Sequence, residues 1–232
     1  MFDLNIKGDS YEKNLRLAVQ AASYDWEHIN FAYDQNNFEL ALTFKKDLQN
    51  NLKDIINVDY TLNIKSDNPN EIRKIIKKYR DKSSCISVSG GNLKVNRASL
   101  ENIQVDILSK PYFKRYDAGI NHVLAREARE NNVAIEIVFN DILKSYLAHR
   151  SKILANFREI YRLHRKYEFP LVLSSGAESI FDIRTVKDFQ AVFTQTGLTE
   201  MEVNNSFKTS NDILEFNKDR KNMILSGVRV VE

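Results

Sequence analysis

The chain has 232 residues and a formal net charge of +3, with 43% hydrophobic residues, 28% charged residues, seven Gly and three Pro. This composition is typical of a folded globular protein and excludes a long flexible linker. A single cysteine, Cys85, excludes an internal disulfide framework, and it is interpreted as a buried thiol because its neighbours are apolar. The sequence shows no signal peptide and no apolar stretch of transmembrane length, so we expect a cytoplasmic protein without a membrane partner.

The small net charge conceals an uneven distribution along the chain. Residues 1–72 carry 7 Lys or Arg against 12 Asp or Glu, whereas residues 73–115 carry 11 against 3 and residues 144–166 carry 7 against 1. Two basic blocks on an otherwise acidic chain indicate a polyanion-binding face, since Lys and Arg neutralise phosphates. For any single lysine, a solvated position on a helix face remains the alternative.

Four strands and three helices are predicted in the first ninety residues. Short apolar or alternating runs predict strands at residues 3–7, 28–33, 58–64 and 85–88. The first helix follows Asp9 or Ser10, the second covers residues 38–52, and the third begins at Asn68-Pro69. The side chains expected to face the core include Leu15, Ala18, Val19 and Ala22 in the first helix and Leu40, Ala41, Phe44, Leu48 and Leu52 in the second.

The centre of the chain predicts a strand, a basic loop, a helix and a second strand. The strands are expected at residues 103–108 and 133–139, and Pro111 opens the irregular loop between the first strand and the helix. That loop carries Lys110, Lys114 and Arg115, and Asp117 is expected to cap the helix. The helix positions expected to face the core are Ile120, Val123, Leu124 and Ala128. Gly90-Gly91, just before this region, is interpreted as a plain turn because it is too short for a dinucleotide-binding motif.

The last third predicts the longest helix, at residues 146–167, followed by a strand at residues 170–174. A further helix begins at Thr185 or Asp188 and ends at Gly197, a short helix covers residues 199–207, and residues 213–232 form a polar tail. The long helix carries a basic ridge with few acidic partners three or four residues away, so its charges are not expected to satisfy one another. The ridge consists of Arg158, Arg162, Arg165 and Lys166.

The strands and helices alternate in at least seven units of roughly 25–35 residues, a repeat typical of α/β barrels of this chain length. We therefore predict a single imperfect TIM-like (β/α) barrel over residues 1–210, with a C-terminal tail over residues 211–232 that becomes ordered on assembly. Functional loops are expected at the carboxyl ends of the strands.

The sequence offers little support for a catalytic centre. Its four histidines do not have the spacing of a metal-binding motif, and no serine lies in a GxSxG motif. The first strand carries Asn5 and Lys7, and the ammonium group of Lys7 would repel a cation. Four carboxylates in or after strands form an alternative catalytic set, although barrel interiors also bury carboxylates that pair with arginine. They are Asp106, Glu136, Glu178 and Asp182.

Three segments together resemble one known family. VDILSKPYFKRYDAGINHVLAREARENNVAIEI, LSSGAESIFDIRTVKDF and the helix end AVFTQTGL are similar to the archaeal ribonuclease P protein component 3 family, which is homologous to the thirty-kilodalton eukaryotic subunit. The resemblance is strongest over residues 105–198, whereas the first hundred residues match mainly in layout. It implies a barrel related to the PHP phosphoesterases (named for polymerase and histidinol phosphatase) that has lost their metal ligands.

The resemblance also implies a function. Members of the family assist a catalytic RNA that removes the 5′ leader from precursor tRNA, and they pair with ribonuclease P protein component 2 in a heterotetramer. The resemblance therefore implies ribonuclease P RNA and component 2 as partners, precursor tRNA as an indirect one, no bound cofactor or metal, and Mg²⁺ for the RNA of the complete enzyme. The implied RNA-binding residues are Lys94, Arg97, Arg115, His122, Lys166 and Arg184.

Structural alternatives accompany two of these residues. The alternative for His122 is a structural role, as a helix histidine whose hydrogen-bonding groups are satisfied by its neighbours. The alternative for Arg184 is a structural ion pair with Asp182 or Glu178. Two other functions also stay open: a stand-alone metal-dependent phosphoesterase of the PHP class, and a structural barrel that only scaffolds a protein partner.

Overall fold

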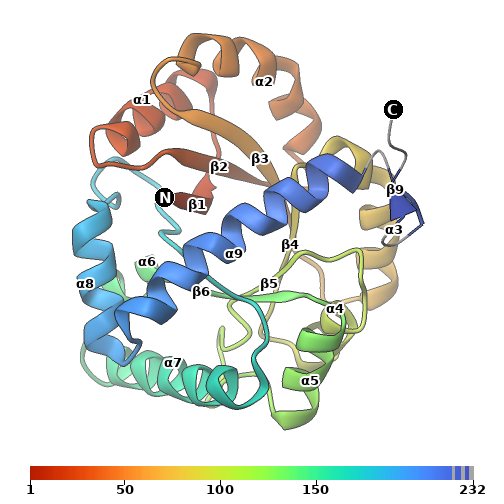
Figure 1. The fold of residues 1–232 in the computed structure, drawn as a ribbon, viewed down its shortest axis with the longest axis vertical. Coiled ribbons are helices and arrows are strands. Elements are labelled where there is room, and N and C mark those ends of the chain that lie inside the picture. The colour runs from red at the N-terminus through yellow and green to blue at the C-terminus, as the bar shows by residue number, and fades with distance from the viewer. Residues whose placement is uncertain (221–222, 226–227, 230–232) are drawn as a thin grey trace.

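The structure, a computed structural model, describes residues 1–220, 223–225 and 228–229. Seven strands form one parallel sheet in which each strand pairs with the next along the chain, and the sheet curls into a nearly closed barrel (Figure 1). The strands are β1 (Phe2–Lys7), β2 (His28–Asp34), β3 (Asn57–Ile64), β4 (Cys85–Ser89), β5 (Ile107–Ser109), β6 (Ala134–Val138) and β7 (Leu171–Ser174). The predicted α/β barrel is confirmed.

Two hydrogen bonds join the first strand to the segment around the last strand. The Lys7 amide donates to the Ala177 carbonyl at 2.8 Å, and the Ser175 amide donates to the Asp3 carboxylate at 3.2 Å. Residues of β6 and β7 are all buried, as expected for parallel strands covered on both faces. These contacts hold β1 and β7 on either side of the barrel's seam.

Helices surround the barrel. They are α1 (Tyr11–Ala22), α2 (Phe38–Leu52), α3 (Pro69–Tyr79) with the 3₁₀ turn η1 (Arg80–Lys82), α4 (Leu93–Leu100), α5 (His122–Glu130), α6 (Phe139–Leu143), α7 (Leu147–Tyr167), α8 (Val186–Thr196) and α9 (Glu200–Asp219). Ser10 caps α1, Asn68 caps α3 with Pro69 in the first helical position, and Thr185 caps α8. Within the described ranges, every helix is too short or too polar to span a bilayer.

Helix α9 covers one end of the barrel, crossing it diagonally in Figure 1. Its Ile213 and Leu214 are buried in a cluster with Leu4, Cys85, Ile107, Ala134 and Val172, most of which begin their strands. The Asn217 side chain also donates to the Ser84 carbonyl just before β4 at 3.0 Å. The amino-terminal end of the barrel is therefore closed, and only the carboxyl-terminal end is left for a site.

The last helix is much longer than predicted. We expected a helix over residues 199–207 and a polar tail from residue 213, but α9 continues to Asp219, so residues 211–219 belong to the barrel's packing. Beyond α9, the strands β8 (Met223–Leu225) and β9 (Val228–Arg229) pair in antiparallel fashion. The remaining tail positions, 221–222, 226–227 and 230–232, lie outside the described residues.

Several other expectations were wrong in detail. The short helices α4 and α6 were not predicted, β5 begins at Ile107 instead of residue 103, and Asn121 caps α5 where Asp117 was expected. The Asn121 side chain accepts from the amides of Val123 and Leu124, while Asp117 binds Arg115 and the Gly119 amide. Three residues assigned to core-facing positions are exposed: Val19, Leu40 and Val123.

Candidate nucleic-acid interface

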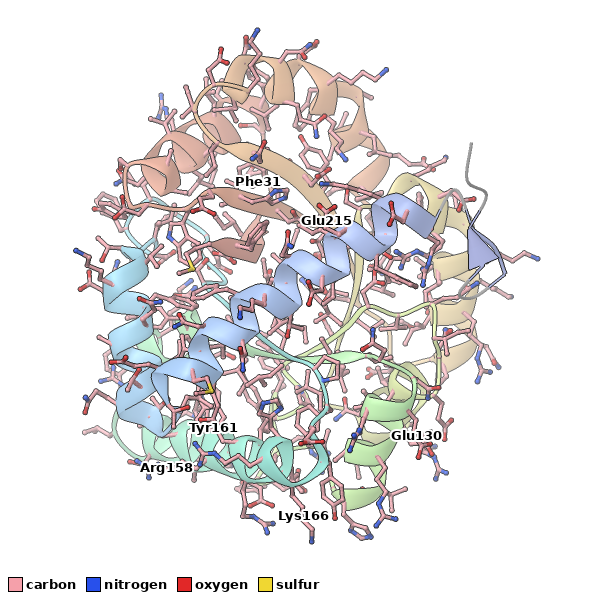
Figure 2. All side chains as sticks on the ribbon, viewed as in Figure 1. Phe31, Glu130, Arg158, Tyr161, Lys166 and Glu215 are labelled. Atoms are coloured by element: carbon pink, nitrogen blue, oxygen red, sulfur yellow. The ribbon has the colours of Figure 1, made fainter. Side chains whose placement is uncertain are left out.

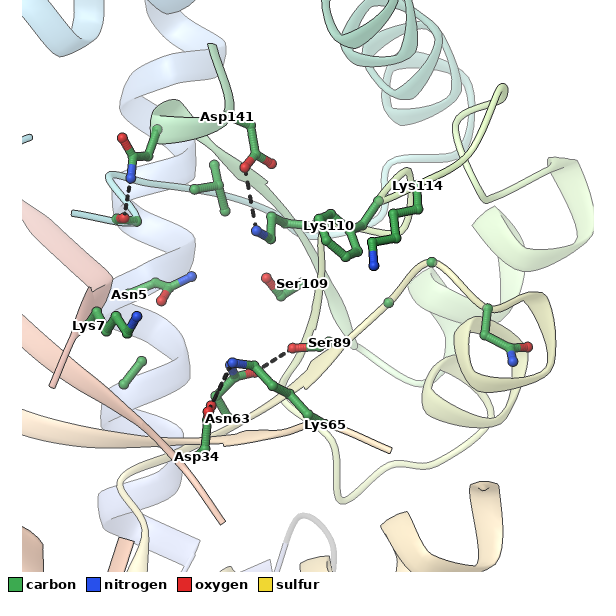
Figure 3. A pocket seen from close by; sticks show the side chains of 18 of the residues that line it. Asn5, Lys7, Asp34, Asn63, Lys65, Ser89, Ser109, Lys110, Lys114 and Asp141 are labelled. Atoms are coloured by element: carbon green, nitrogen blue, oxygen red, sulfur yellow. Dashed lines mark hydrogen bonds and ion pairs between the residues drawn. The ribbon is translucent and has the colours of Figure 1, made fainter. Parts of the chain in front are cut away.

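A pocket of about 1330 Å³ opens at the carboxyl-terminal end of the barrel. The ends of most strands and the loops that follow them line it, as expected for functional loops of a barrel. Figure 3 shows Asn5 and Lys7 of β1, Asn63 of β3, Ser89 of β4 and Ser109 of β5 projecting toward its centre. Most of the residues that line the pocket are polar or charged.

Beneath the pocket, the buried Glu136 carboxylate is held by neutral groups. It accepts hydrogen bonds from Ser174 at 2.6 Å and from the Asn5 amide nitrogen at 3.2 Å. Burial raises the pKa of Glu136 on β6, and it likewise raises the pKa of Asp3 on β1. The two carboxyl groups therefore favour the neutral state more than exposed carboxylates do.

The four carboxylates considered as a catalytic set have separate partners. Glu178 lies between two cations, Lys7 at 3.4 Å and Lys144, and the contact with Lys144 lowers its pKa although partial burial opposes this. Asp182 caps its own loop by accepting from the amides of Glu178 and Ser179. Asp106 is buried against Arg80 at 2.7 Å and accepts from the Ile86 amide. Each carboxylate is thus satisfied by local partners of its own.

The donor set does not fit a metal centre. Across residues 1–220 and the two described C-terminal strands, no group of three or more His, Cys, Asp or Glu side chains could hold a metal ion. At the mouth of the pocket the first strand instead presents Asn5 and Lys7, and the Lys7 ammonium occupies space beside the Glu178 carboxylate. This arrangement favours binding of an anion over binding of a cation.

The cations around the pocket fall into two groups. Most are paired: Lys65 with Asp34 at 2.9 Å and Lys110 with Asp141 at 3.4 Å, as Figure 3 shows. Arg115 binds both oxygens of Asp117 and also donates to the Gly91 carbonyl, which fixes its guanidinium.

Two exposed lysines form the second group, which we call the basic rim: Lys94 on α4 and Lys114 in the β5–α5 loop. Among the residues that the structure describes, neither has a carboxylate within 4.0 Å. The basic rim therefore offers positive charge to a ligand, and so do Lys7 and Lys144, two pocket cations that share the single Glu178 carboxylate.

The structure places the six predicted RNA-binding residues in several regions. Only Lys94 and Arg115 line the pocket. Arg97 is exposed one turn beyond Lys94 and pairs with Glu101 at 2.7 Å, which raises its pKa. His122 is exposed as the first residue of α5. The alternative interpretation, in which neighbouring groups satisfy this histidine, expected a less exposed position.

The remaining two predicted residues lie away from the pocket. Lys166 is exposed near the end of α7 (Figure 2), just before β7 and hence toward the opposite end of the barrel. Arg184 lies in the loop before α8, where it donates to the carbonyls of Phe181 and Ile183 at 2.6 and 3.0 Å. The alternative of an ion pair between Arg184 and Asp182 or Glu178 is wrong.

Sequence reasoning missed part of the site and misjudged the basic ridge. Lys65, which directly follows a predicted strand, and Lys144, which opens the second basic block, line the pocket, but neither was named as a site residue. On α7, Arg162 pairs with Glu159 and Arg165 pairs with Glu202 of α9, so the expectation of unsatisfied ridge charges was wrong for both.

Sequence comparisons with known proteins identify one family. The profile of the family described as "RNase P subunit p30" matches residues 1–222. Ribonuclease P protein component 3 of Methanothermobacter thermautotrophicus is 40% identical over 99% of this chain and 95% of its own length, and that of Methanococcus maripaludis is 39% identical over 73% of each.

Solved structures give the same picture for the fold. A chain of the cryo-EM structure of archaeal ribonuclease P with mature tRNA is 30% identical, with a TM-score of 0.82 over 100% of this chain and 98% of that one. Histidinol phosphate phosphatase of Lactococcus lactis, solved with zinc, L-histidinol and phosphate, is only 14% identical, with a TM-score of 0.59 over 85% of this chain and 94% of that one. The second similarity concerns the barrel alone.

Proposed function

The chain belongs to the RNase P subunit p30 family, and from this premise we propose that it serves as a protein subunit of ribonuclease P, the complex that removes the 5′ leader from precursor tRNA. The observation that carries the proposal is similarity along the whole chain, both to component 3 proteins and to a chain of an archaeal ribonuclease P bound to mature tRNA. A shared barrel alone would not carry it, because the same fold hosts unrelated activities.

The chemistry of leader removal belongs, in this proposal, to the RNA subunit and its Mg²⁺ ions, and this chain carries no cofactor or metal of its own. Supporting this, each carboxylate near the pocket is held by local partners, and the described residues offer no cluster of metal ligands. A general acid or base must reach its substrate, and the buried Glu136 and Asp3 do not line the pocket.

RNA binding is assigned to basic residues on several faces of the barrel: Lys94, Arg97, Arg115, His122, Lys166 and Arg184. Their separation suits a large RNA that wraps around the protein, because phosphate contacts orient a protein without reading bases. The protein partner is component 2, in a heterotetramer of two copies each, precursor tRNA is contacted indirectly, and the complex works in the cytoplasm.

The proposal is tested by mixing the purified chain with component 2 and the ribonuclease P RNA of the same host. We expect a monomer alone, a heterotetramer with component 2, and salt-sensitive assembly with the RNA. Metal analysis of protein purified without chelator should find no stoichiometric zinc or manganese. A large homo-oligomer that ignores component 2, or two metal equivalents with matching phosphatase activity, would reject the proposal in favour of a phosphoesterase.

A further inference from the structure

The loop between β5 and α5 exposes two aromatic rings at the edge of the pocket. Tyr116 is 93% exposed and Phe113 is 45% exposed, and both line the pocket beside the basic rim. Leu93 on α4, 51% exposed, borders the same opening. Single exposed apolar residues are common, but exposed aromatics interleaved with lysines are the composition that binds single-stranded nucleic acid.

This loop is held by contacts on either side of the two exposed rings. Tyr112 is buried against Phe157, donates to the Asp141 carboxylate at 2.9 Å and accepts from the Val138 amide at 3.2 Å. At the other end, the buried Asn96 side chain donates to the carbonyls of Pro111 and Gly119 at 3.1 and 2.8 Å. The rings are thus presented on a fixed backbone.

Backbone conformation in the loop confirms that tertiary contacts impose its shape. Lys110 and Lys114 both adopt left-handed conformations, with φ of 49° and 54°, which residues other than glycine rarely adopt. Gly119, with φ of 72°, packs so closely on Pro111 that a Cβ atom there would lie 1.9 Å from the Pro111 carbonyl oxygen. Because the loop is already ordered, it loses less conformational entropy when a ligand binds to it.

Cations accompany each exposed ring. The ammonium groups of Lys110 and Lys114 lie 5.0 and 5.3 Å from the centre of the Phe113 ring, and that of Lys152 on α7 lies 3.2 Å from the centre of the Tyr116 ring. A base stacked on either ring would bring its own phosphate close to these ammonium groups. The paired cations deeper in the pocket are neutralised, so the phosphates are attracted to the rim.

We propose that Phe113 and Tyr116 form a stacking site for unpaired bases of RNA, with Lys94, Lys114 and Lys152 binding the flanking phosphates. The site takes single-stranded or bulged nucleotides because bases inside a duplex present no free face to a ring. It shows no preference for base identity, since every base has a face that can stack. This inference rests on the proposed function, because it assumes that the chain contacts RNA.

The test measures binding of the full chain to two fluorescently labelled RNAs by anisotropy at fixed salt: a 12-nucleotide single strand and a blunt hairpin duplex. Replacing both rings, Phe113→Ala with Tyr116→Ala, should weaken single-strand binding roughly tenfold or more for each ring and leave duplex binding unchanged. Phe113→Leu with Tyr116→Leu should lose the same affinity because leucine keeps apolar area without a planar face. Tyr116→Phe should retain wild-type binding.

Phe181→Ala is the matched control, since Phe181 is an aromatic residue whose exposure, 80%, lies between those of Phe113 and Tyr116, and it does not line the pocket. Circular dichroism and thermal unfolding check that each variant folds. If the wild-type chain binds neither RNA, the proposed function and this inference fail together. If the wild-type chain binds both RNAs and the ring variants bind them equally well, the stacking site alone is rejected. If the ring variants keep RNA binding but lose binding to component 2, the stacking site is rejected in favour of a protein-docking surface.

Discussion

Arg184 shows why a residue's partners matter as much as its position. Its guanidinium donates to backbone carbonyls of its own loop, and it does not line the pocket, whereas Lys94 and Arg115 do. No carboxylate among the described residues is left unpaired by its removal, because Glu178 and Asp182 have other partners. Its charge is therefore available to a phosphate while its loop remains held by backbone bonds.

We predict that Arg184→Ala reduces the slope of log affinity against log salt, for the ribonuclease P RNA, by about 0.7–0.9. The free energy of unfolding should fall by only about 1 kcal/mol, the value of a hydrogen bond or two near the surface. Lys208→Ala on the exposed face of α9 is the control and should change neither quantity. Calorimetry and salt titrations measure both, and a strongly destabilised variant with the wild-type slope would remove Arg184 from the binding residues.

At the scale of elements, α9 was the hardest to predict. Its buried face contains Ser206, Ser210 and Asn217, which appear polar in sequence but bond within the helix or to the barrel. By contrast, β4, β6 and β7 were predictable as continuously buried apolar runs, and β3 was predictable from its alternating side chains. Helices α4 and α6 were missed because they are too short for a periodic pattern to identify.

The attachment of α9 gives a pH-dependent prediction. Glu202 completes the capping box with Thr199 and receives two hydrogen bonds from Arg165 of α7, and these contacts, Arg165 first, lower the pKa of Glu202 to about 2. The folded-state pKa is below the ordinary 4.5, so the ionised group stabilises the fold fully above pH 4.5 and this stabilisation is lost as pH falls toward 2.

Glu202→Gln should therefore lower the free energy of unfolding by about 1–3 kcal/mol at pH 6, and the difference from wild type should shrink steadily toward pH 3. Denaturant unfolding at several pH values measures it. Glu159→Gln, which removes an exposed pair within α7, is the control and should cost less than about 0.5 kcal/mol at every pH. A difference that stays constant between pH 6 and pH 3 would show that the charge of Glu202 is not responsible.

At the scale of the whole molecule, the sequence predicted the barrel and the family but only part of the pocket's charge pattern. The unpaired state of Lys94 and the paired state of Lys65 depend on side chains from other strands and loops, such as Asp34, which is 31 residues from Lys65. Spacing along the chain does not contain this information. The same holds for the exposed rings of Phe113 and Tyr116, which the sequence alone does not distinguish from the buried Tyr112.

The central claim is that this chain positions RNA and leaves the chemistry to it. The most direct measurement is the single-turnover rate of 5′-leader cleavage by the reconstituted complex carrying Lys7→Met with Glu178→Gln, compared with Lys94→Ala with Lys114→Ala. The account predicts that the first variant cleaves at the wild-type rate, and that the second reaches that rate only at higher protein concentration or lower salt. A fall of about 100-fold in the cleavage rate of the first variant, with RNA binding unchanged, would contradict the account.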